Sequence, residues 1–492
     1  MELTELEKYF SEYRLNTIGY NSEYESPYGI QKVIYGDWIA SGRLYKQIEN
    51  KISNEFGPFI ANTHTEANET SSRMTFAYRT ALNIIKNHVN SGEDDIIITA
   101  GSGMTTVINK FQRILGLRSC GQIMSKNCLQ DREKPVVFIT HMEHHSNHTS
   151  WYATTAEVIV IKPDENLLVD ISDLEKQLLK FKDRKFKLAS ITACSNVTGI
   201  NTPYYQIAEL MHKHGGLCFV DFAASAPYEN INMHPENTLQ KLDAIFFSPH
   251  KFLGGPGSSG VLIFDKSMYH NQIPDHPGGG TVEWTNPWGE YKFVDDIEIR
   301  EDGGTPGFLQ AIKTALAILL KDKMSVTKIK QREKEMLNII WPGLKSIDGI
   351  KILANNIPNR LSVISFYHEE IHYNLIVKLL SDRYGIQVRG GCDCAGTYGH
   401  YLLKVSQEHS KSITEKINNG DLSNKPGWVR LSLHPTNTNE EIYFVLKAIN
   451  EIVINFKSWA QDYDYSAKSN EFFHKAGYTQ ATKLKTEKLF KI

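Results

Sequence analysis

The sequence is poor in cysteine, in net charge and in long apolar runs. Six cysteines in 492 residues are too few for a disulfide scaffold. The 54 basic and 56 acidic residues nearly cancel, so no global field favours nucleic acid or an anionic membrane. No apolar run approaches the roughly 20 residues of a membrane helix, and the N-terminal MELTELEKYF lacks a cationic leader followed by an apolar block. We therefore expect a cytoplasmic protein that acts on a small molecule.

The chain has the composition of a soluble globular protein and is too long for one hydrophobic core. Hydrophobic residues make up 41% and charged residues 22%. From about residue 70 to 265, helical patterns alternate with short apolar runs that are typical of buried parallel strands. These runs cover residues 95–99, 135–140, 158–161, 188–193, 217–220, 244–248 and 260–264. The pattern predicts an α/β fold with a mostly parallel, seven-stranded sheet.

The second half of the chain has a different pattern. A Gly- and Pro-rich stretch, residues 274–307, has no clear periodicity. After it come long helical patterns over 309–344, with strand-like segments at 361–366 and 429–433, which predict a smaller α+β domain. From about residue 462, lysines are spread among aromatic and apolar residues, as in a peripheral helix or a partly ordered tail. The expected division is a large domain at 41–308, a small domain at 1–40 and 309–460, and a C-terminal extension at 461–492.

One segment places a lysine where a buried strand meets a glycine-rich turn. It is AIFFSPHKFLGGPGSSGVLIF, residues 244–264. An amine such as that of Lys251, at a strand end beside small residues, can lose its proton and condense with an aldehyde. Ser248 and His250 flank it with groups that suit phosphate oxygens. Taken alone, a surface lysine in a turn explains the segment better.

Two other strand ends carry groups that suit the same ligand. Asp221 stands where an apolar strand gives way to small residues, and a carboxylate there can keep a pyridine nitrogen protonated. An N-cap aspartate is the structural alternative. In TAGSGMTTVIN, residues 99–109, glycines precede a helical pattern, so the amides of Gly103, Met104 and Thr105 can converge on a phosphate. As a lone glycine loop this signal is weak.

A histidine cluster follows another strand end, in ITHMEHHSNH. An imidazole such as that of His144 can stack on a flat aromatic ring. The neighbouring His141, His145 and His148 leave a zinc site open as an alternative, although the His-Glu-x-x-His spacing is absent.

The order and spacing of these motifs resemble the class V aminotransferase family, over residues of roughly 30–450. The likeness is greatest to the cysteine desulfurase and selenocysteine lyase branch. It implies a pyridoxal phosphate (PLP) enzyme of fold type I, a homodimer, with Lys251 bound to the cofactor as a Schiff base. The residues that would contact the cofactor are Gly103, Met104, Thr105, His144, Asn196, Asp221, Ser248, His250, Lys251 and Thr305.

Three of the implied roles depend on the resemblance alone. Asn196, in SNVTGIN, resembles a cofactor-contacting asparagine of the family. Thr305, in EDGGTP, resembles a threonine that reaches the phosphate of the neighbouring subunit. Arg430, in WVRLSLHPTNT, resembles the family's C-terminal arginine, whose guanidinium fork would bind the substrate α-carboxylate.

The segment VRGGCDCAGTYGH carries the information about the reaction. Desulfurases of the family have an arginine followed five positions later by a cysteine that accepts sulfur, which here gives Arg389 and Cys394. The pattern Arg-x-Gly-Cys-x-Cys also resembles the molybdenum-cofactor sulfurase branch. A nearby Arg389 would contact substrate and favour the thiolate of Cys394 or Cys392. Two packed cysteines in a turn remain the structural alternative.

These motifs predict removal of sulfur from L-cysteine, which gives alanine and an enzyme persulfide. Lys251 would move the Cα proton, Cys394 would attack the sulfur, and Cys392 could relay it toward a sulfur-acceptor protein. One position departs from the family, because Ala224 stands where its desulfurases usually have glutamine; Ser225 is a candidate to compensate. An aminotransferase, another amino-acid lyase or epimerase, and a PLP-binding protein without turnover therefore remain alternatives.

Overall fold

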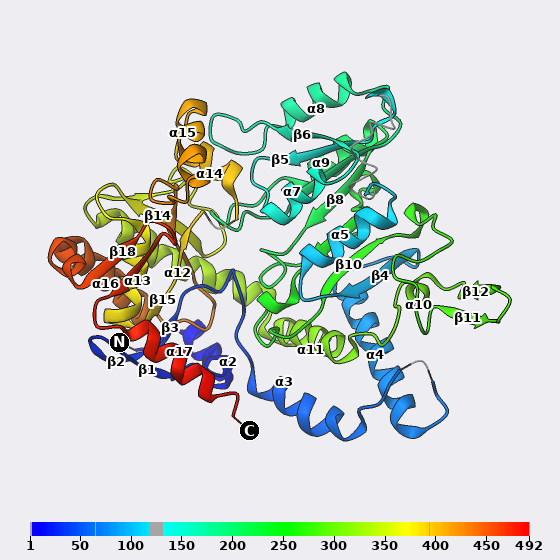
Figure 1. Ribbon diagram of the computed structural model, residues 1–492, viewed down its shortest axis with the longest axis horizontal. Helices are drawn as coiled ribbons and strands as arrows, with labels where there is room; N and C mark the ends of the chain where they lie inside the picture. The colour runs from blue at the N-terminus through cyan, green and yellow to red at the C-terminus, as the bar shows by residue number, and fades with distance from the viewer. Residues whose placement is uncertain (1, 64, 119–130, 393, 492) are drawn as a thin grey trace. The chain divides into compact units, whose positions relative to one another are not determined.

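The computed structural model describes residues 2–63, 65–118, 131–392 and 394–491 and contains two compact units (Figure 1). The large unit comprises residues 40–195 and 201–327, and the small unit comprises residues 1–39, 196–200 and 328–492. Residues 309–327 thus belong to the large unit, whereas the sequence placed the change of domain at residue 308. No helix in the described residues is long and apolar enough to cross a membrane.

A seven-stranded sheet forms the centre of the large unit. Its order is β4-β10-β9-β8-β7-β5-β6, and β10 alone runs in the direction opposite to the other six strands. The strands are β4 (Asp95–Ala100), β5 (Val136–Thr140), β6 (Glu157–Ile161), β7 (Lys187–Thr192), β8 (Leu217–Asp221), β9 (Ala244–Phe247) and β10 (Gly260–Asp265). The predicted fold class is confirmed, and each apolar run forms the strand expected of it.

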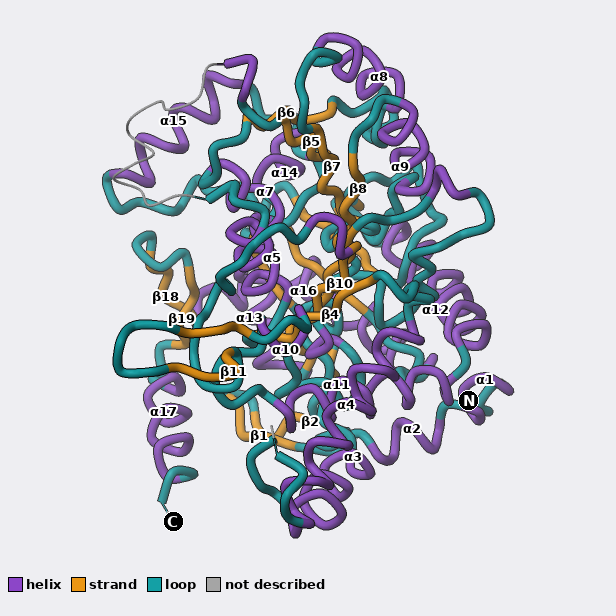
Figure 2. The backbone as a smooth tube through the Cα atoms, turned by 90° about the vertical axis from the view of Figure 1, so that its right-hand side faces the viewer, coloured by secondary structure: helices purple, strands orange, loops and turns teal. Residues whose placement is uncertain are grey.

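Helices cover both faces of this sheet, which explains why its strands are apolar on both sides. In the edge-on view of Figure 2, α5 (Met104–Ile114) and α7 (His145–Tyr152) lie on one side, and α8 (Ile171–Lys180) and α9 (Tyr204–Lys213) on the other. On the α5 side, the ring of Phe111 packs against two strand phenylalanines, with centroids 5.1 and 4.8 Å away. All the strand ends that carry predicted site residues belong to the parallel set, so they lie at one edge of the sheet.

The rest of the large unit surrounds this core. Its helices are α3 (Lys46–Asn50), α4 (Glu69–His88), α10 (Ile297–Arg300) and α11 (Phe308–Met324). The shorter helical turns are η1 (Lys51–Phe56), η2 (Gly57–Phe59), η3 (Asp131–Glu133), η4 (Thr238–Gln240), η5 (Pro249–Lys251) and η6 (Lys266–Met268). The Gly- and Pro-rich stretch is ordered and contains a hairpin, β11 (Val282–Thr285) and β12 (Tyr291–Phe293), before α10.

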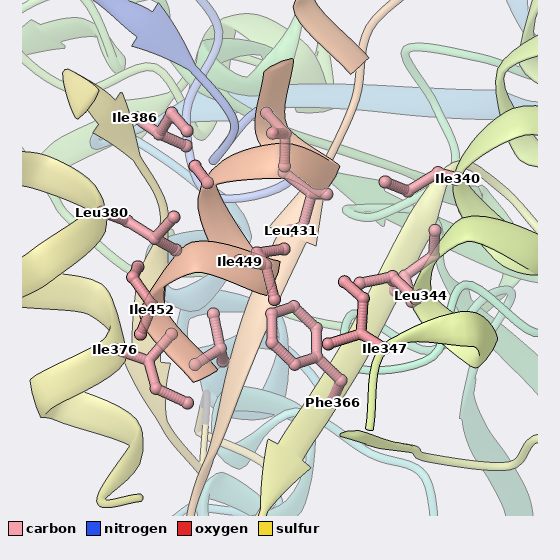
Figure 3. Close-up of a cluster of buried hydrophobic side chains, with 14 of the residues drawn as sticks. Ile340, Leu344, Ile347, Phe366, Ile376, Leu380, Ile386, Leu431, Ile449 and Ile452 are labelled. Carbon is pink, nitrogen blue, oxygen red and sulfur yellow. The ribbon is translucent and has the colours of Figure 1, made fainter. Parts of the chain in front are cut away.

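The small unit is built on a four-stranded antiparallel sheet with the order β13-β14-β17-β16. These strands are β13 (Ile350–Ile352), β14 (Val363–His368), β16 (Arg389–Gly391) and β17 (Trp428–Ser432). Three long helices, α12 (Val326–Ser346), α13 (Tyr373–Tyr384) and α16 (Asn439–Trp459), share its hydrophobic core. Figure 3 shows Phe366 and Leu431 of the sheet among isoleucines and leucines of these helices.

Shorter elements complete the small unit. The helices are α1 (Glu5–Tyr9), α2 (Ser11–Asn16), α14 (Gly396–Leu402), α15 (Gln407–Asn418), η7 (Ala460–Asp462) and α17 (Tyr478–Lys488). The strands are β1 (Glu23–Ser26), β2 (Gly29–Lys32), β3 (Ile34–Tyr35), β15 (Ile386–Gln387), β18 (Tyr463–Ser466) and β19 (Glu471–His474). The C-terminal segment therefore forms the antiparallel hairpin β18–β19 before its helix, a hairpin that the sequence analysis did not foresee.

Candidate active site

The predicted phosphate loop lies between β4 and α5. Gly103 caps α5 in an extended conformation, and a Cβ atom there would lie 3.1 Å from both Ser248 Oγ and His250 Cε1. The Met104 N–H donates to Ser248 Oγ at 2.9 Å, and His250 Nδ1 donates to the Ser102 carbonyl at 2.8 Å. The loop and the Ser-Pro-His-Lys segment thus form one surface, and their close approach favours glycine over a residue with a side chain at position 103.

Asp221 and Lys251 lie within electrostatic reach of each other. Asp221 ends β8, its side chain is buried with the residue 2% exposed, and its Oδ1 accepts a hydrogen bond from the Ala223 N–H at 2.8 Å. Burial raises the pKa of Asp221 to about 6, while the positive charge of Lys251 acts in the opposite direction. Lys251 ends η5, directly after β9, and is half-buried. A buried carboxyl group and an amine thus lie at the ends of adjacent strands.

Ser146 links His144 to the predicted phosphate loop through two hydrogen bonds. His144 caps α7, and its Nδ1 accepts from the Ser146 N–H at 3.1 Å, so the neutral ring carries its proton on Nε2. Ser146 Oγ in turn lies 2.6 Å from Thr105 Oγ1. His141 is directed elsewhere, because its Nε2 lies 3.0 Å from the Leu167 carbonyl. Within the described residues, no three His, Cys, Asp or Glu side chains are grouped to hold a metal.

Glu143 is a site residue that the sequence analysis did not select. Its carboxylate accepts from Thr140 Oγ1 at 2.6 Å, Asn147 Nδ2 at 2.7 Å and the Thr192 N–H at 2.9 Å. Burial raises its pKa to about 8, and the charge of Asp221 adds to this effect. Glu143 therefore joins β5, β7 and α7 and fixes the turn that presents His144. Its position directly before His144 was the available signal.

The small unit brings a second set of predicted residues together. Arg430 lies on β17 and is only 3% exposed. Its Nη1 donates to the Asn196 carbonyl at 3.2 Å, and its Nη2 donates to Asp37 Oδ1 at 2.8 Å. Arg389 on β16 is the register partner of Arg430, and its Nε donates to Asp37 Oδ2 at 3.1 Å. Asp37, which the sequence analysis did not select, bridges the two arginines.

The two predicted thiols follow β16. Cys392 is half-buried, Cys394 is exposed, and both are free; residue 393 lies outside the described residues. Cys394 has a positive φ of 58°, a value that is uncommon for a residue with a side chain and marks a tight turn. An exposed thiol in a turn is accessible to a reactant, as sulfur transfer requires. Thr305 of the large unit is also exposed, in the loop that leads to α11.

The family described as "Aminotransferase class-V" matches residues 34–445. The chain belongs to this family. A probable cysteine desulfurase of Halalkalibacterium halodurans is 28% identical to it over 371 residues, which cover 74% of this chain and 84% of that protein. A probable cysteine desulfurase of Pyrococcus abyssi is 26% identical over 434 residues, which cover 87% and 96%.

Solved structures of other proteins have the same fold. The apo structure of a cysteine desulfurase from Thermococcus onnurineus NA1 aligns with a TM-score of 0.72 at 21% identity, covering 92% of this chain and 99% of that one. A cysteine desulfurase of Escherichia coli, solved in an S-sulfonic acid form, aligns with a TM-score of 0.66 at 19% identity, covering 85% and 94%. These likenesses confirm the predicted fold type.

Proposed function

We propose that this class V enzyme is a PLP-dependent cysteine desulfurase, which converts L-cysteine to alanine and leaves the sulfur on Cys394 as a persulfide. The observation that carries the proposal is the exposed thiol of Cys394, in a turn five residues after Arg389. The names of the curated relatives support the same reaction. We further propose that the enzyme is a cytoplasmic homodimer.

The large unit fits PLP in three respects. A Cβ atom at position 103 would lie 3.1 Å from Ser248 Oγ and His250 Cε1, so glycine keeps side-chain atoms away from the N-terminus of α5, where a phosphate would bind. The carboxylate of Asp221 is buried at a raised pKa, so a cationic ring nitrogen would stabilise its charge. Lys251 supplies an amine within reach of that carboxylate. When bound, PLP would supply a pyridinium ring that withdraws electrons from the substrate Cα.

The other proposed cofactor contacts come from residues outside the phosphate loop and the Ser-Pro-His-Lys segment. His144 would stack on the ring and Asn196 would contact the cofactor, as in the family. Thr305 is exposed, so its hydroxyl is free to reach the phosphate of a second subunit. The hydroxyl of Ser225 is buried without a hydrogen-bond partner among the described residues, and it follows Ala224, the position where family desulfurases usually have glutamine.

Separate residues of the protein would bind the substrate carboxylate, transfer the proton and accept the sulfur. Arg430 would bind the substrate α-carboxylate through its guanidinium fork. The free amine of Lys251 would take the proton from the substrate Cα and would later donate a proton back to the substrate. The thiolate of Cys394 would attack the cysteine sulfur, so an S–S bond forms while the Cβ–S bond breaks and its electron pair returns to the carbon skeleton. Cys392 would pass that sulfur to an acceptor protein.

The test is to incubate the holoenzyme with L-cysteine and to measure alanine and protein-bound persulfide. Cys394→Ser should reduce both products to background, while Cys392→Ser should retain alanine formation and slow only the release of sulfur to an acceptor thiol. Cys218→Ser is the matched control, because Cys218 is fully buried in β8. Unchanged alanine formation by the Cys392→Ser/Cys394→Ser double variant would rule out the desulfurase mechanism.

An aminotransferase is the second candidate, because Ala224 stands where desulfurases of the family usually have glutamine. Such an enzyme would need a 2-oxo acid to complete each turnover, whereas a desulfurase would not. Alanine release from L-cysteine without any oxo acid therefore separates the two reactions.

A further inference from the structure

The segment that carries Asp37 is fixed on both sides by the small unit. The Gly36 N–H donates to the Gln387 carbonyl, and the Gly36 carbonyl accepts from the Ser432 N–H, both at 2.8 Å. The Ile39 N–H donates to Ser432 Oγ at 3.0 Å. The backbone of Asp37 therefore lies along β17, with hydrogen bonds on the residues before and after it. These bonds fix the position from which the Asp37 side chain extends.

The next residue adds a rigid aromatic contact. The ring of Trp38 stacks on that of His434, with centroids 4.1 Å apart and planes at 19°. Burial lowers the pKa of His434 to about 3, so this ring is neutral at physiological pH. The stack fixes Trp38 without adding a charge, and the cations that Asp37 contacts are the two arginines.

Arg389 and Arg430 are an unusual pair for a sheet. They lie directly opposite each other on neighbouring antiparallel strands, where side chains share one face with Cβ atoms about 5 Å apart and like charges repel. Asp37 offers one carboxylate oxygen to each guanidinium, at 2.8 Å and 3.1 Å. The three side chains together retain one positive charge, which matches the single negative charge of an α-carboxylate.

Burial differs along this triad. The side chain of Arg430 is 3% exposed, that of Asp37 is 14% and that of Arg389 is 50%. Asp37 and Arg389 also line a cavity of about 620 Å³ within the small unit. The buried guanidinium is thus held by two acceptors, Asp37 and the Asn196 carbonyl, while the exposed one begins the strand that leads to Cys392.

We propose that Asp37 is a positioning residue for recognition of the substrate carboxylate. It fixes the plane of the Arg430 fork, and because its negative charge balances one of the two positive charges, it allows Arg389 to lie beside Arg430 at the start of the strand that leads to Cys392. The inference rests on the carboxylate-binding role proposed for Arg430. A bidentate fork discriminates only when its plane is fixed, so the effect of Asp37 falls on ligands that carry a carboxylate.

The test compares two inhibitors of the holoenzyme that differ only in this group, L-alanine and ethylamine. Asp37→Asn should weaken inhibition by L-alanine roughly tenfold, the size expected for loss of one charge-assisted hydrogen bond, and should leave inhibition by ethylamine unchanged. The KM for L-cysteine should rise more than kcat falls. Asp37→Glu should recover part of the preference for L-alanine. Asp382→Asn is the matched control, because buried Asp382 of the same unit bonds Lys378 and Tyr463 instead.

Arg430→Ala separates this inference from the proposed function. If Arg430→Ala loses the preference for L-alanine and Asp37→Asn keeps it, the inference is wrong while the role of Arg430 stands. If neither variant changes the preference, the role of Arg430 is wrong as well. Tighter binding of L-alanine by Asp37→Asn would show that Asp37 competes with substrate, which also overturns the inference.

If Asp37→Asn does not fold, the same substitution can be tested in a protein that also carries Arg389→Gln. In Arg389→Gln, no two guanidinium groups remain to repel each other when Asp37 is neutralised. The double variant Asp37→Asn/Arg389→Gln should still bind L-alanine more weakly than Arg389→Gln alone. Equal binding by these two proteins would contradict a positioning role.

Discussion

Replacement of Asp221 by asparagine should make the cofactor-free protein more stable at neutral pH, although the residue is proposed to contact the cofactor. Asparagine keeps the shape of the side chain and can still accept the hydrogen bond from the Ala223 N–H. What it removes is a buried negative charge, whose burial raises the pKa of Asp221 from 3.8 to about 6. A carboxyl group with a raised pKa prefers to be protonated in the folded state, so its ionisation opposes folding.

The size and the sign of this effect follow from linkage. A pKa of 3.8 in the unfolded chain and about 6 in the folded protein corresponds to about 3 kcal/mol of lost stability above pH 6. The loss develops as the pH rises from 3.8 to 6 and is then complete. Between pH 5 and pH 7.5 the wild type should therefore lose about 1.5 kcal/mol relative to Asp221→Asn.

The assay is urea unfolding of both proteins after the cofactor has been removed, at pH 5 and at pH 7.5. The stability difference between variant and wild type should grow with pH. Saturating PLP should then reverse the order, because a cationic ring nitrogen stabilises the carboxylate of the wild type alone, and a ligand stabilises the protein that binds it more tightly. A stability difference that does not change with pH would refute the reasoning about burial, and equal stabilisation by PLP would refute the proposed ring contact.

Two further substitutions test the phosphate loop and the core. Gly103→Ala should weaken PLP binding in an absorbance titration, because its Cβ would lie 3.1 Å from Ser248 Oγ and His250 Cε1; unfolding of the cofactor-free protein should change by less than about 1 kcal/mol, since the backbone there is extended. Gly279→Ala, with no atom within 4 Å of its Cβ, is the control, and equal PLP affinity of both variants would contradict the cradle. Phe366→Ala should destabilise the small unit by about 3–5 kcal/mol in urea, because the ring is fully buried. A loss below about 1 kcal/mol would show that this core tolerates the cavity.

The sequence predicted the central sheet because burial on both faces leaves a continuous apolar signal. The run at residues 244–248 became β9, and the run at 217–220 became β8, each within one residue. The two hairpins left no such signal. Val282–Thr285 has only one partly buried residue among three exposed ones, and Tyr463–Ser466 alternates little. Short strands of this kind are held by pairing with each other, which a pattern of burial does not encode.

The same distinction applies to the site. Lys251, Asp221 and the loop at Gly103 stand at the ends of strands that the sequence already predicted, so parallel topology alone places them at one edge. Asp37 follows a two-residue strand, and its partner Arg430 lies 393 residues away in the chain. No local sequence pattern predicts the contact between Asp37 and Arg430. The structure shows it, together with the strand register that places Arg389 opposite Arg430.

Asp221 and Asp37 differ in their surroundings, and this difference gives the two carboxyl groups different properties. Burial raises the pKa of Asp221, so the folded protein disfavours the negative charge of this carboxyl group unless a cation binds next to it. Asp37 has two guanidinium groups on its oxygens, so its charge is already balanced, and one positive charge of the triad remains. We therefore expect Asp221→Asn to weaken the binding of a cationic ring by the large unit. We expect Asp37→Asn to weaken the binding of a carboxylate by the small unit.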